Sequence, residues 1–307
     1  MPGTKLDILC LGEPLVEFNK TGGDQWTEGI GGDVSNVAIA ARRQGAASGI
    51  ATRLGGDSFG DLIMDCWARE QVNTDAVVRD KDAPTGIYFI RHGAEGHSFE
   101  YRRKGSAASL MSPDNLPRTA IRSARLLHLS GITQAISDDA RKAGFAAIGE
   151  ARGAGVKVSY DPNLRLRLWP LEQARETIHD AMRQVDIALP GLDDARLLTG
   201  LEQPEEIAAF YRDLGCSIVA LTLGAEGALV SFADRVERVP APKARQVDAT
   251  GAGDCFDGAF LAFWLETGDP LAAARYAVIA AGLSVEGYGA ITPIPTRDQV
   301  HARLAAG

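Results

Sequence analysis

Short apolar runs rich in β-branched residues alternate along the chain with segments whose apolar positions recur at helical spacing. The segment 33–45, DVSNVAIAARRQG, has its valines and alanines on one helical face and ends in a glycine, and 59–71 repeats this pattern. Strands are expected at 8–11, 124–129, 156–160, 185–189 and 218–223. The alternation predicts an α/β fold with a mainly parallel sheet that helices cover on both faces.

Two stretches interrupt this alternation. Residues 14–19 and 86–103 both look extended without a helix to pair with, and the second, GIYFIRHGAEGHSFEYRR, has the pattern of a hairpin that turns at Gly93–Gly96. A small β-layer that projects from the main sheet and covers a cleft would account for both. Because no linker, repeat or low-complexity segment is present, we expect a single domain over 1–307, with lid segments near 14–19 and 86–103.

Composition limits the possible partners. Hydrophobic residues make up 45% of the chain and charged residues 23%, which is ordinary for a soluble globular protein. The net charge is −8, from 32 basic and 40 acidic residues. A protein that binds nucleic acid or an anionic membrane would need a basic surface, so neither partner is expected. An anionic small ligand remains possible because it needs only a local basic pocket.

The chain also lacks signals for export or membrane insertion. The N-terminus, MPGTKLDILCLG, has no long apolar run, and no later segment reaches the ~18 apolar residues of a membrane span. The four cysteines show neither metal-ligand nor redox spacing, so we expect them to be reduced and mostly buried. These features predict a cytoplasmic protein.

The most specific candidate chemistry lies in 247–260, VDATGAGDCFDGAF. This is not a P-loop, because no lysine follows the glycines, and it is not a dinucleotide fingerprint, because Phe256 stands where a third glycine is needed. From Gly253 the apolar residues follow helical spacing up to Gly268. Gly251 and its neighbours up to Asp254 therefore occupy a helix N-terminus, whose unpaired N–H groups and positive dipole end bind anions.

Asp254 is the candidate catalytic residue of this turn. The helix dipole is expected to hold its carboxylate ionised, which is unfavourable for phosphate binding alone. The arrangement becomes useful if the carboxylate takes a proton from a hydroxyl that attacks the phosphate, a role that contributes ~10²–10⁴-fold in rate. The simpler alternative is that Asp254 only supports the first turn of the helix. We favour phosphoryl transfer.

Three motifs resemble those of the ribokinase-like (PfkB-type) sugar kinases. Residues 248–254 match D-[ST]-x-G-A-G-D with the small residue and the threonine exchanged, 31–38 match G-G-x-x-x-N-x-A, and 222–227 match T-x-G-x-x-G. The matches stand in the family's order and span almost the whole chain. The resemblance implies a ribokinase-like αβα sandwich with a β-sheet lid, in agreement with the elements expected above.

The resemblance also assigns roles to residues of this chain. It makes Asp254 the base, and the backbone of Gly251, Ala252 and Gly253 an anion hole for the transferred group. It places Gly32 and Asn36 on sugar hydroxyls, and it implies ATP with Mg²⁺. For the nucleotide it implies contacts with Asn163, Arg165, Thr222, Gly224, Ala225, Gly227, Gly251 and Gly253.

One segment departs from the family pattern. The family often carries N-x-x-E before an L-T-G segment, whereas here Gly191 replaces the Asn and Asp194 replaces the Glu. The metal ligands are therefore left unassigned. A monovalent-cation site near Asp248 and Thr250, which occurs in some relatives, is left open.

Four further segments look like those of 2-keto-3-deoxygluconate kinases: 12–19, 100–109, 130–137 and 161–169. This comparison implies that Tyr88, Tyr101, Arg103 and Arg165 contact the substrate. Arg165 follows an expected parallel strand, and ligands of such sheets lie beyond the carboxyl ends of the strands. A guanidinium fork suits a sugar carboxylate, which a neutral sugar lacks. Alternatively, the basic cluster 102–104 is a solvated hairpin end and the tyrosines only pack on the lid.

The favoured function is ATP-dependent phosphorylation of 2-keto-3-deoxygluconate at its 6-hydroxyl. Within the same class, the alternative is a kinase for a neutral sugar such as fructose or a riboside. From a different class, the alternative is a catalytically silent sugar-acid-binding protein, which the intact Asp254 and glycines disfavour. The partners expected are a sugar acid and ATP. A homo-oligomer is possible because an exposed lid sheet offers a surface for self-pairing.

Overall fold

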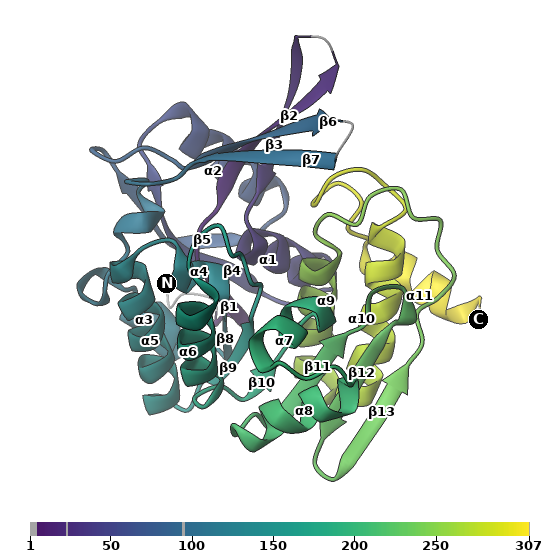
Figure 1. Ribbon diagram of the computed structural model, residues 1–307. Helices are drawn as coiled ribbons and strands as arrows, with labels where there is room; N and C mark the ends of the chain where they lie inside the picture. The colour runs from purple at the N-terminus through teal and green to yellow at the C-terminus, as the bar shows by residue number, and fades with distance from the viewer. Residues whose placement is uncertain (1–4, 23, 94–95, 307) are drawn as a thin grey trace.

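A large, mainly parallel sheet forms the centre of the molecule (Figure 1). The computed structural model describes residues 5–22, 24–93 and 96–306. Neighbouring strands are parallel from β5 to β11, and β12 and β13 add antiparallel at one edge. In the described residues the order is β13 (Arg235–Val239), β12 (Ala228–Phe232), β11 (Ile218–Thr222), β10 (Ile187–Ala188), β9 (Lys157–Asp161), β8 (Leu126–Ser130), β1 (Ile8–Leu11), β4 (Ser48–Gly55) and β5 (Asn73–Asp80).

Helices cover both faces of this sheet, because its central strands are apolar on both sides. In β1, Ile8 and Cys10 pack into the core on one face, and Leu9 and Leu11 pack into the core on the other. The first face carries α1 (Asp33–Arg43), α2 (Ser58–Arg69), α9 (Ala252–Thr267), α10 (Pro270–Ser284) and α11 (Arg297–Ala305). The second carries α3 (Arg118–Ser123), α4 (Gly131–Ala135), α5 (Asp138–Gly153), α6 (Leu171–Met182), α7 (Leu192–Thr199) and α8 (Pro204–Asp213).

A small second sheet projects from the large one (Figure 1). Its strand order is β3 (Gln25–Gly31), β2 (Leu15–Gly22), β6 (Ile87–Gly93) and β7 (Gly96–Arg102). Strands β6 and β7 form the hairpin expected from the sequence, and residues 94–95 of its turn lie outside the described residues. The αβα sandwich with its small projecting sheet confirms the predicted fold class.

Several strands are not among those expected from the sequence. Strands β4 and β5 extend the large sheet beyond β1, and β12 and β13 form its antiparallel edge. β3 is the missing partner of β2 in the small sheet; its sequence, QWTEGIG, is largely exposed and contains two glycines. Such a strand is held by its ladder to β2 rather than by burial, so apolar patterning does not mark it. No helix in the described ranges is long and apolar enough to span a membrane.

The two helices that begin at the functional end of the sheet, α1 and α9, cross at Gly258. A Cβ at this position would lie 2.6 Å from the carbonyl oxygen of Val37 and 2.8 Å from the backbone nitrogen of Ala41. Only a residue without a side chain allows this approach of helix to helix. The contact holds the N-termini of both helices at the same edge of the sheet, where β1 and its parallel neighbours end.

We predict that Gly258→Ala destabilises the protein, although alanine is the better helix former. The added methyl group overpacks the helix crossing, so the free energy of unfolding should fall by about 1–3 kcal/mol in urea denaturation. The matched control is Gly149→Ala in α5, where a Cβ meets no atom within 4 Å. There, alanine should stabilise the helix by up to ~1 kcal/mol. Equal stabilisation by both substitutions would contradict the close crossing.

Candidate active site

A cleft of about 770 Å³ opens where the parallel strands end, next to the small sheet. It is lined by the loops that follow the strands, by the starts of α1 and α9, and by side chains of the small sheet. The cleft brings together most of the residues that the sequence predicts for substrate and phosphate. These are Gly32, Asn36, Tyr88, Tyr101, Arg103, Asn163, Arg165, Thr222, Gly251, Gly253 and Asp254.

Asp254 lies in the first turn of α9, where its Oδ2 accepts a 2.7 Å hydrogen bond from Nδ2 of Asn36 on α1. Gly251 is the N-cap of α9 and has a left-handed φ of 73°. A Cβ there would lie 2.9 Å from Cβ of Ala290, so the turn requires glycine. A Cβ on Gly253 would meet no atom within 4 Å, so the space in front of this helix start is open to an anion.

The electrostatic setting of Asp254 differs from the sequence expectation. Burial, followed by the charge of Asp33, raises the pKa of Asp254 to about 7, against the effects of the Asn36 hydrogen bond and of Arg165. The expectation that the helix dipole holds this carboxylate ionised is therefore wrong near and below neutral pH. Burial and neighbouring carboxylates also raise the pKa values of Asp161 and Asp257. A carboxylate that titrates near neutrality suits a general base.

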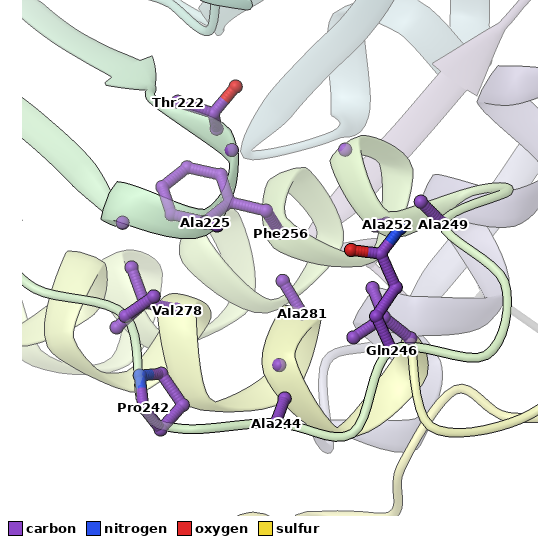
Figure 2. A pocket seen from close by; sticks show the side chains of 16 residues that line it. Thr222, Ala225, Pro242, Ala244, Gln246, Ala249, Ala252, Phe256, Val278 and Ala281 are labelled. Atoms are coloured by element: carbon purple, nitrogen blue, oxygen red, sulfur yellow. The ribbon is translucent and has the colours of Figure 1, made fainter.

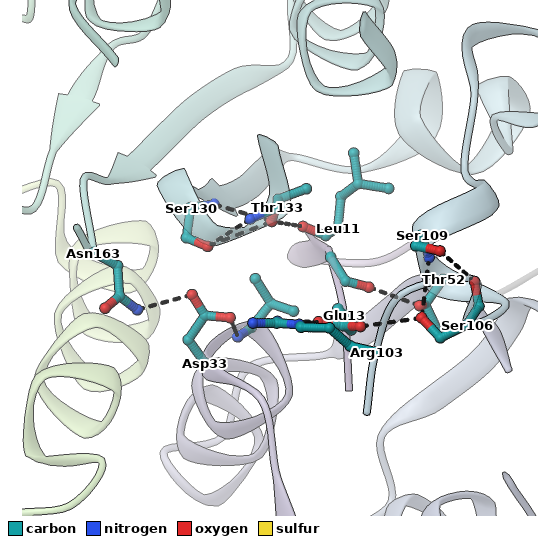
Figure 3. A network of polar contacts seen from close by, with 12 residues as sticks. Leu11, Glu13, Asp33, Thr52, Arg103, Ser106, Ser109, Ser130, Thr133 and Asn163 are labelled. Carbon is teal, nitrogen blue, oxygen red and sulfur yellow. Dashed lines mark hydrogen bonds and ion pairs between the residues drawn. The ribbon is translucent and has the colours of Figure 1, made fainter. Parts of the chain in front are cut away.

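Three carboxylates hold the loop that follows β9 and carries Arg165. Nδ2 of Asn163 donates to Asp33 at 2.8 Å (Figure 3). The backbone nitrogen of Asn163 donates to Asp161 at 3.0 Å. The backbone nitrogen of Leu164 donates to Asp194 at 2.8 Å. The predicted nucleotide contact of Asn163 stays a prediction, although its side-chain nitrogen is already bound to Asp33.

Asp194 and Gly191, at which the sequence departs from the motif that it resembles, both line the cleft. Oδ2 of Asp194 is 4.0 Å from Nη1 of Arg165, and half of the Arg165 side chain is exposed. An ion pair at this distance and exposure is weak. Nη1 of Arg165 also donates to the backbone oxygen of Leu164 at 2.8 Å, so turning this group toward a ligand would require that hydrogen bond to break.

The other end of the cleft is aromatic and basic. The rings of Tyr88 and Tyr101 stack with centroids 5.5 Å apart, and the guanidinium carbon of Arg103 lies 5.1 Å from the centroid of Tyr101. Arg103 forms an ion pair with Glu13, and only 10% of its side chain is exposed. The alternative of a solvated hairpin end is therefore wrong for Arg103. It holds for Arg102, which is 65% exposed and pairs with Glu100.

Glu13 and Glu17 are further polar residues at the candidate site that the sequence does not identify. Glu13 lies in the cleft, and Glu17 accepts a hydrogen bond from the hydroxyl of Tyr88. One sequence feature could have identified Glu13: it is a carboxylate that comes directly after the apolar run ILCLG, at the carboxyl end of a buried strand. Such a carboxylate must find a partner because an unpaired buried charge is unstable.

A second, apolar cavity of about 250 Å³ adjoins the cleft (Figure 2). The two share Thr222, Ala249 and Gly253 in their linings. Phe256, Pro242 and Val278 surround the cavity (Figure 2). An apolar slot of this size next to an anion-binding helix start suits a flat heteroaromatic ring that carries phosphates. The remaining predicted nucleotide residues line it: Gly224, Ala225 and Gly227. Ala252 of the predicted anion hole lines it as well.

The segment before α9 is held by the carboxylate of Asp248. Its Oδ1 accepts from the backbone nitrogen of Thr250 at 2.9 Å and from the Thr250 hydroxyl at 2.6 Å, and its Oδ2 accepts from the nitrogen of Gly289 at 2.9 Å. Asp248 thus joins the glycine-rich turn to the loop near 286–292. The monovalent-cation site near these residues stays a prediction.

Comparison with known proteins gives matches over nearly the whole chain. The family model described as pfkB family carbohydrate kinase matches residues 6–297. A 2-dehydro-3-deoxygluconokinase of Thermoproteus tenax is 37% identical over 312 residues, covering 98% of this chain and 95% of the relative. Fructokinase-1 of Zea mays is 31% identical, covering 95% and 96%. The crystal structure of a PfkB protein from Polaromonas sp. JS666 is 34% identical, with a TM-score of 0.88 and coverage of 98% and 100%.

We predict that Asp254 titrates near pH 7 in the wild-type protein and at lower pH in Asp33→Asn. Since Asp33 is the largest charge effect on the pKa of Asp254, removing that charge should lower this pKa while the shape of the site is kept. The measurement is ¹³C NMR of side-chain carboxyl groups as a function of pH, with Asp254→Asn to assign the resonance. An unchanged titration in Asp33→Asn would contradict the coupling.

Proposed function

The chain belongs to the pfkB family of carbohydrate kinases, and from that premise we propose that it transfers the γ-phosphoryl group of ATP to the 6-hydroxyl of 2-keto-3-deoxygluconate. One observation carries the proposal. A single cleft joins a carboxylate at a helix start, Asp254, to two arginines from separate elements, Arg103 and Arg165. Asp254 at the helix start supports phosphoryl transfer to a hydroxyl. The two arginines support a substrate that carries a carboxylate.

In the proposed reaction, Asp254 accepts the proton of the 6-hydroxyl as its oxygen forms a bond to the γ-phosphorus. The bond from the γ-phosphorus to the bridging oxygen breaks, and ADP leaves with that electron pair. The N–H groups of 251–254 stabilise the oxygens of the transferred group. Asn36 orients the base through Nδ2, and its buried Oδ1, which has no partner among the described residues, is left to accept from a sugar hydroxyl.

The adjoining apolar cavity supports binding of the adenine ring of ATP, with the phosphates directed to the start of α9. The donor set at the cleft also fits Mg²⁺, which typically takes one or two carboxylates together with nucleotide phosphates and water. Asp161 and Asp194 would hold it, since both carboxyl groups line the cleft. An ion held there would neutralise charge that develops on the phosphates.

The charged groups around the cleft support the proposed substrate class. The carboxyl groups of Asp33, Asp161, Asp254 and Asp257 line the cleft, so an anionic substrate needs local cationic contacts to bind. Arg103 and Arg165 are positioned to supply them. The similarity to the Thermoproteus tenax enzyme supports the same choice, since 2-dehydro-3-deoxygluconate is another name for this sugar acid.

A neutral ketose is the second candidate substrate. The observation in its favour is the Glu13–Arg103 ion pair, which already compensates the charge of Arg103. The similarity to Fructokinase-1 of Zea mays points the same way. Initial rates of ADP release across sugar acids, ketoses and nucleosides separate the two candidates, and a protein that only binds sugar acids would release no ADP.

We predict that Asp254→Asn lowers kcat by at least ~10²-fold while ATP still binds, because the proton acceptor is lost and the backbone donors remain. In the wild-type enzyme, kcat/KM should rise as the pH rises through about 7, the pKa of Asp254, because the base must be deprotonated. Steady-state kinetics measure kcat and the pH dependence of kcat/KM, and titration calorimetry measures ATP binding. Near-normal turnover by the folded variant would leave Asp254 only a supporting role in the helix.

We further predict that Arg103→Ala lowers kcat/KM for 2-keto-3-deoxygluconate by roughly 10- to 150-fold, the value of one hydrogen bond between charged groups. The matched control is Arg102→Ala, which removes the neighbouring exposed arginine and should change little. Arg103→Lys should restore only part of the loss, because a point charge replaces a two-pronged donor. Equal losses on the sugar acid and on fructose would mean that Arg103 only supports the small sheet. A wild-type enzyme that prefers fructose would overturn the substrate assignment.

A further inference from the structure

Glu13 is a fully buried carboxylate that the proposed reaction does not use directly. It follows β1 at the carboxyl edge of the large sheet, and its side chain is 0% exposed. Burial raises its pKa despite the opposing effect of Arg103. A charge in such a place must be paired and hydrogen-bonded to be tolerated. Its partners therefore indicate what it does.

Both oxygens of Glu13 are engaged (Figure 3). Oε2 accepts from Nε of Arg103 at 2.8 Å and also from Nη2, and Oε1 accepts from the hydroxyl of Ser106 at 3.2 Å. Arg103 directly follows β7 of the small sheet, whereas Glu13 lies two residues after the end of β1 of the large sheet. The ion pair therefore joins the two sheets at the cleft.

This pairing fixes which edge of Arg103 faces a ligand. The Nε–Nη2 edge of the guanidinium is directed to Glu13, and the group also lies over the ring of Tyr101. Nη1 has no hydrogen-bond partner within residues 5–22, 24–93 and 96–306. Because a guanidinium is planar, these contacts leave one edge, which includes Nη1, to bind an anion in the cleft.

We propose that Glu13 is the positioning residue for Arg103 and thereby determines the orientation in which the substrate carboxylate binds. The inference rests on the proposed sugar-acid function. The Glu13–Arg103 ion pair as a whole is close to neutral. It therefore selects a carboxylate by directed hydrogen bonds from Nη1 of Arg103 more than by long-range attraction. The orientation of the carboxylate then places the far end of the sugar relative to Asp254, and small displacements there have large effects on rate.

The test compares Glu13→Gln with the wild-type enzyme on 2-keto-3-deoxygluconate. The substitution keeps the shape and an acceptor for Arg103 but removes the charge that strengthens the bond, so kcat/KM should fall by about 5- to 10-fold. KM for ATP should stay unchanged. The matched control is Glu150→Gln, which removes the same charge from a carboxylate paired with Arg118 and Arg122 on α3. This control should leave kcat/KM unchanged.

A double-variant cycle separates positioning from a general structural role. If Glu13 acts through Arg103, adding Glu13→Gln to Arg103→Ala should cause no further loss of kcat/KM. Additive losses, or a raised KM for ATP, would mean that Glu13 only stabilises the fold. Should Glu13→Gln not fold, Glu13→Asp serves instead. This substitution keeps the charge but moves it away from Arg103 by the length of one methylene group. We therefore expect a smaller loss of kcat/KM than in Glu13→Gln, and no further loss when it is added to Arg103→Ala.

The outcomes also separate this inference from the proposed function. A wild-type enzyme that uses the sugar acid, together with Glu13→Gln at the wild-type rate, overturns the positioning role alone. A wild-type enzyme that rejects every sugar acid overturns the proposed substrate and the positioning role with it. Loss of kcat/KM in Glu13→Gln that depends on Arg103, with Glu150→Gln unaffected, supports both.

Discussion

The close packing of α9 on α1 at Gly258 is the constraint on which the rest of the site depends. With no side chain between them, the two helices approach backbone to backbone, and both begin at the carboxyl edge of the parallel sheet. α1 brings Asn36 and α9 brings Asp254, so two residues 218 positions apart in sequence share a 2.7 Å hydrogen bond. The helix start that supplies N–H groups for a phosphate thereby also carries a positioned proton acceptor. Phosphoryl transfer needs both in one place.

The same packing makes the site acidic, and this acidity governs its chemistry. Burial and the charge of Asp33 raise the pKa of Asp254 to about 7, so the candidate base gains and loses its proton near neutral pH. Carboxylates also organise the cleft: Asp33, Asp161 and Asp194 hold the loop of Arg165, and Glu13 holds Arg103. An acidic site of this kind favours a nucleotide that arrives with Mg²⁺ and a substrate bound through a few directed cationic contacts.

The sequence predicts those features that are local in the chain. Alternating apolar runs indicate the sandwich, and the turn before Asp254 is recognisable because glycines and a helix start follow one another directly. The features that the sequence does not predict depend on contacts between distant residues. The partner of Glu13 is 90 positions away, and the pKa of Asp254 reflects burial together with Asp33 from another helix. Strand β3 is missed because pairing with β2, and not an apolar face, holds it in place.

The most direct test of the central claim is a crystal structure of the wild-type protein with a non-hydrolysable ATP analogue, Mg²⁺ and 2-keto-3-deoxygluconate. We predict that the 6-hydroxyl oxygen lies within about 3 Å of the carboxylate of Asp254. The γ-phosphate should lie against the N–H groups of residues 251–254, and the sugar carboxylate should lie on Arg103 or Arg165. A complex in which the γ-phosphate is bound away from the start of α9, or in which no sugar hydroxyl reaches Asp254, would contradict the account.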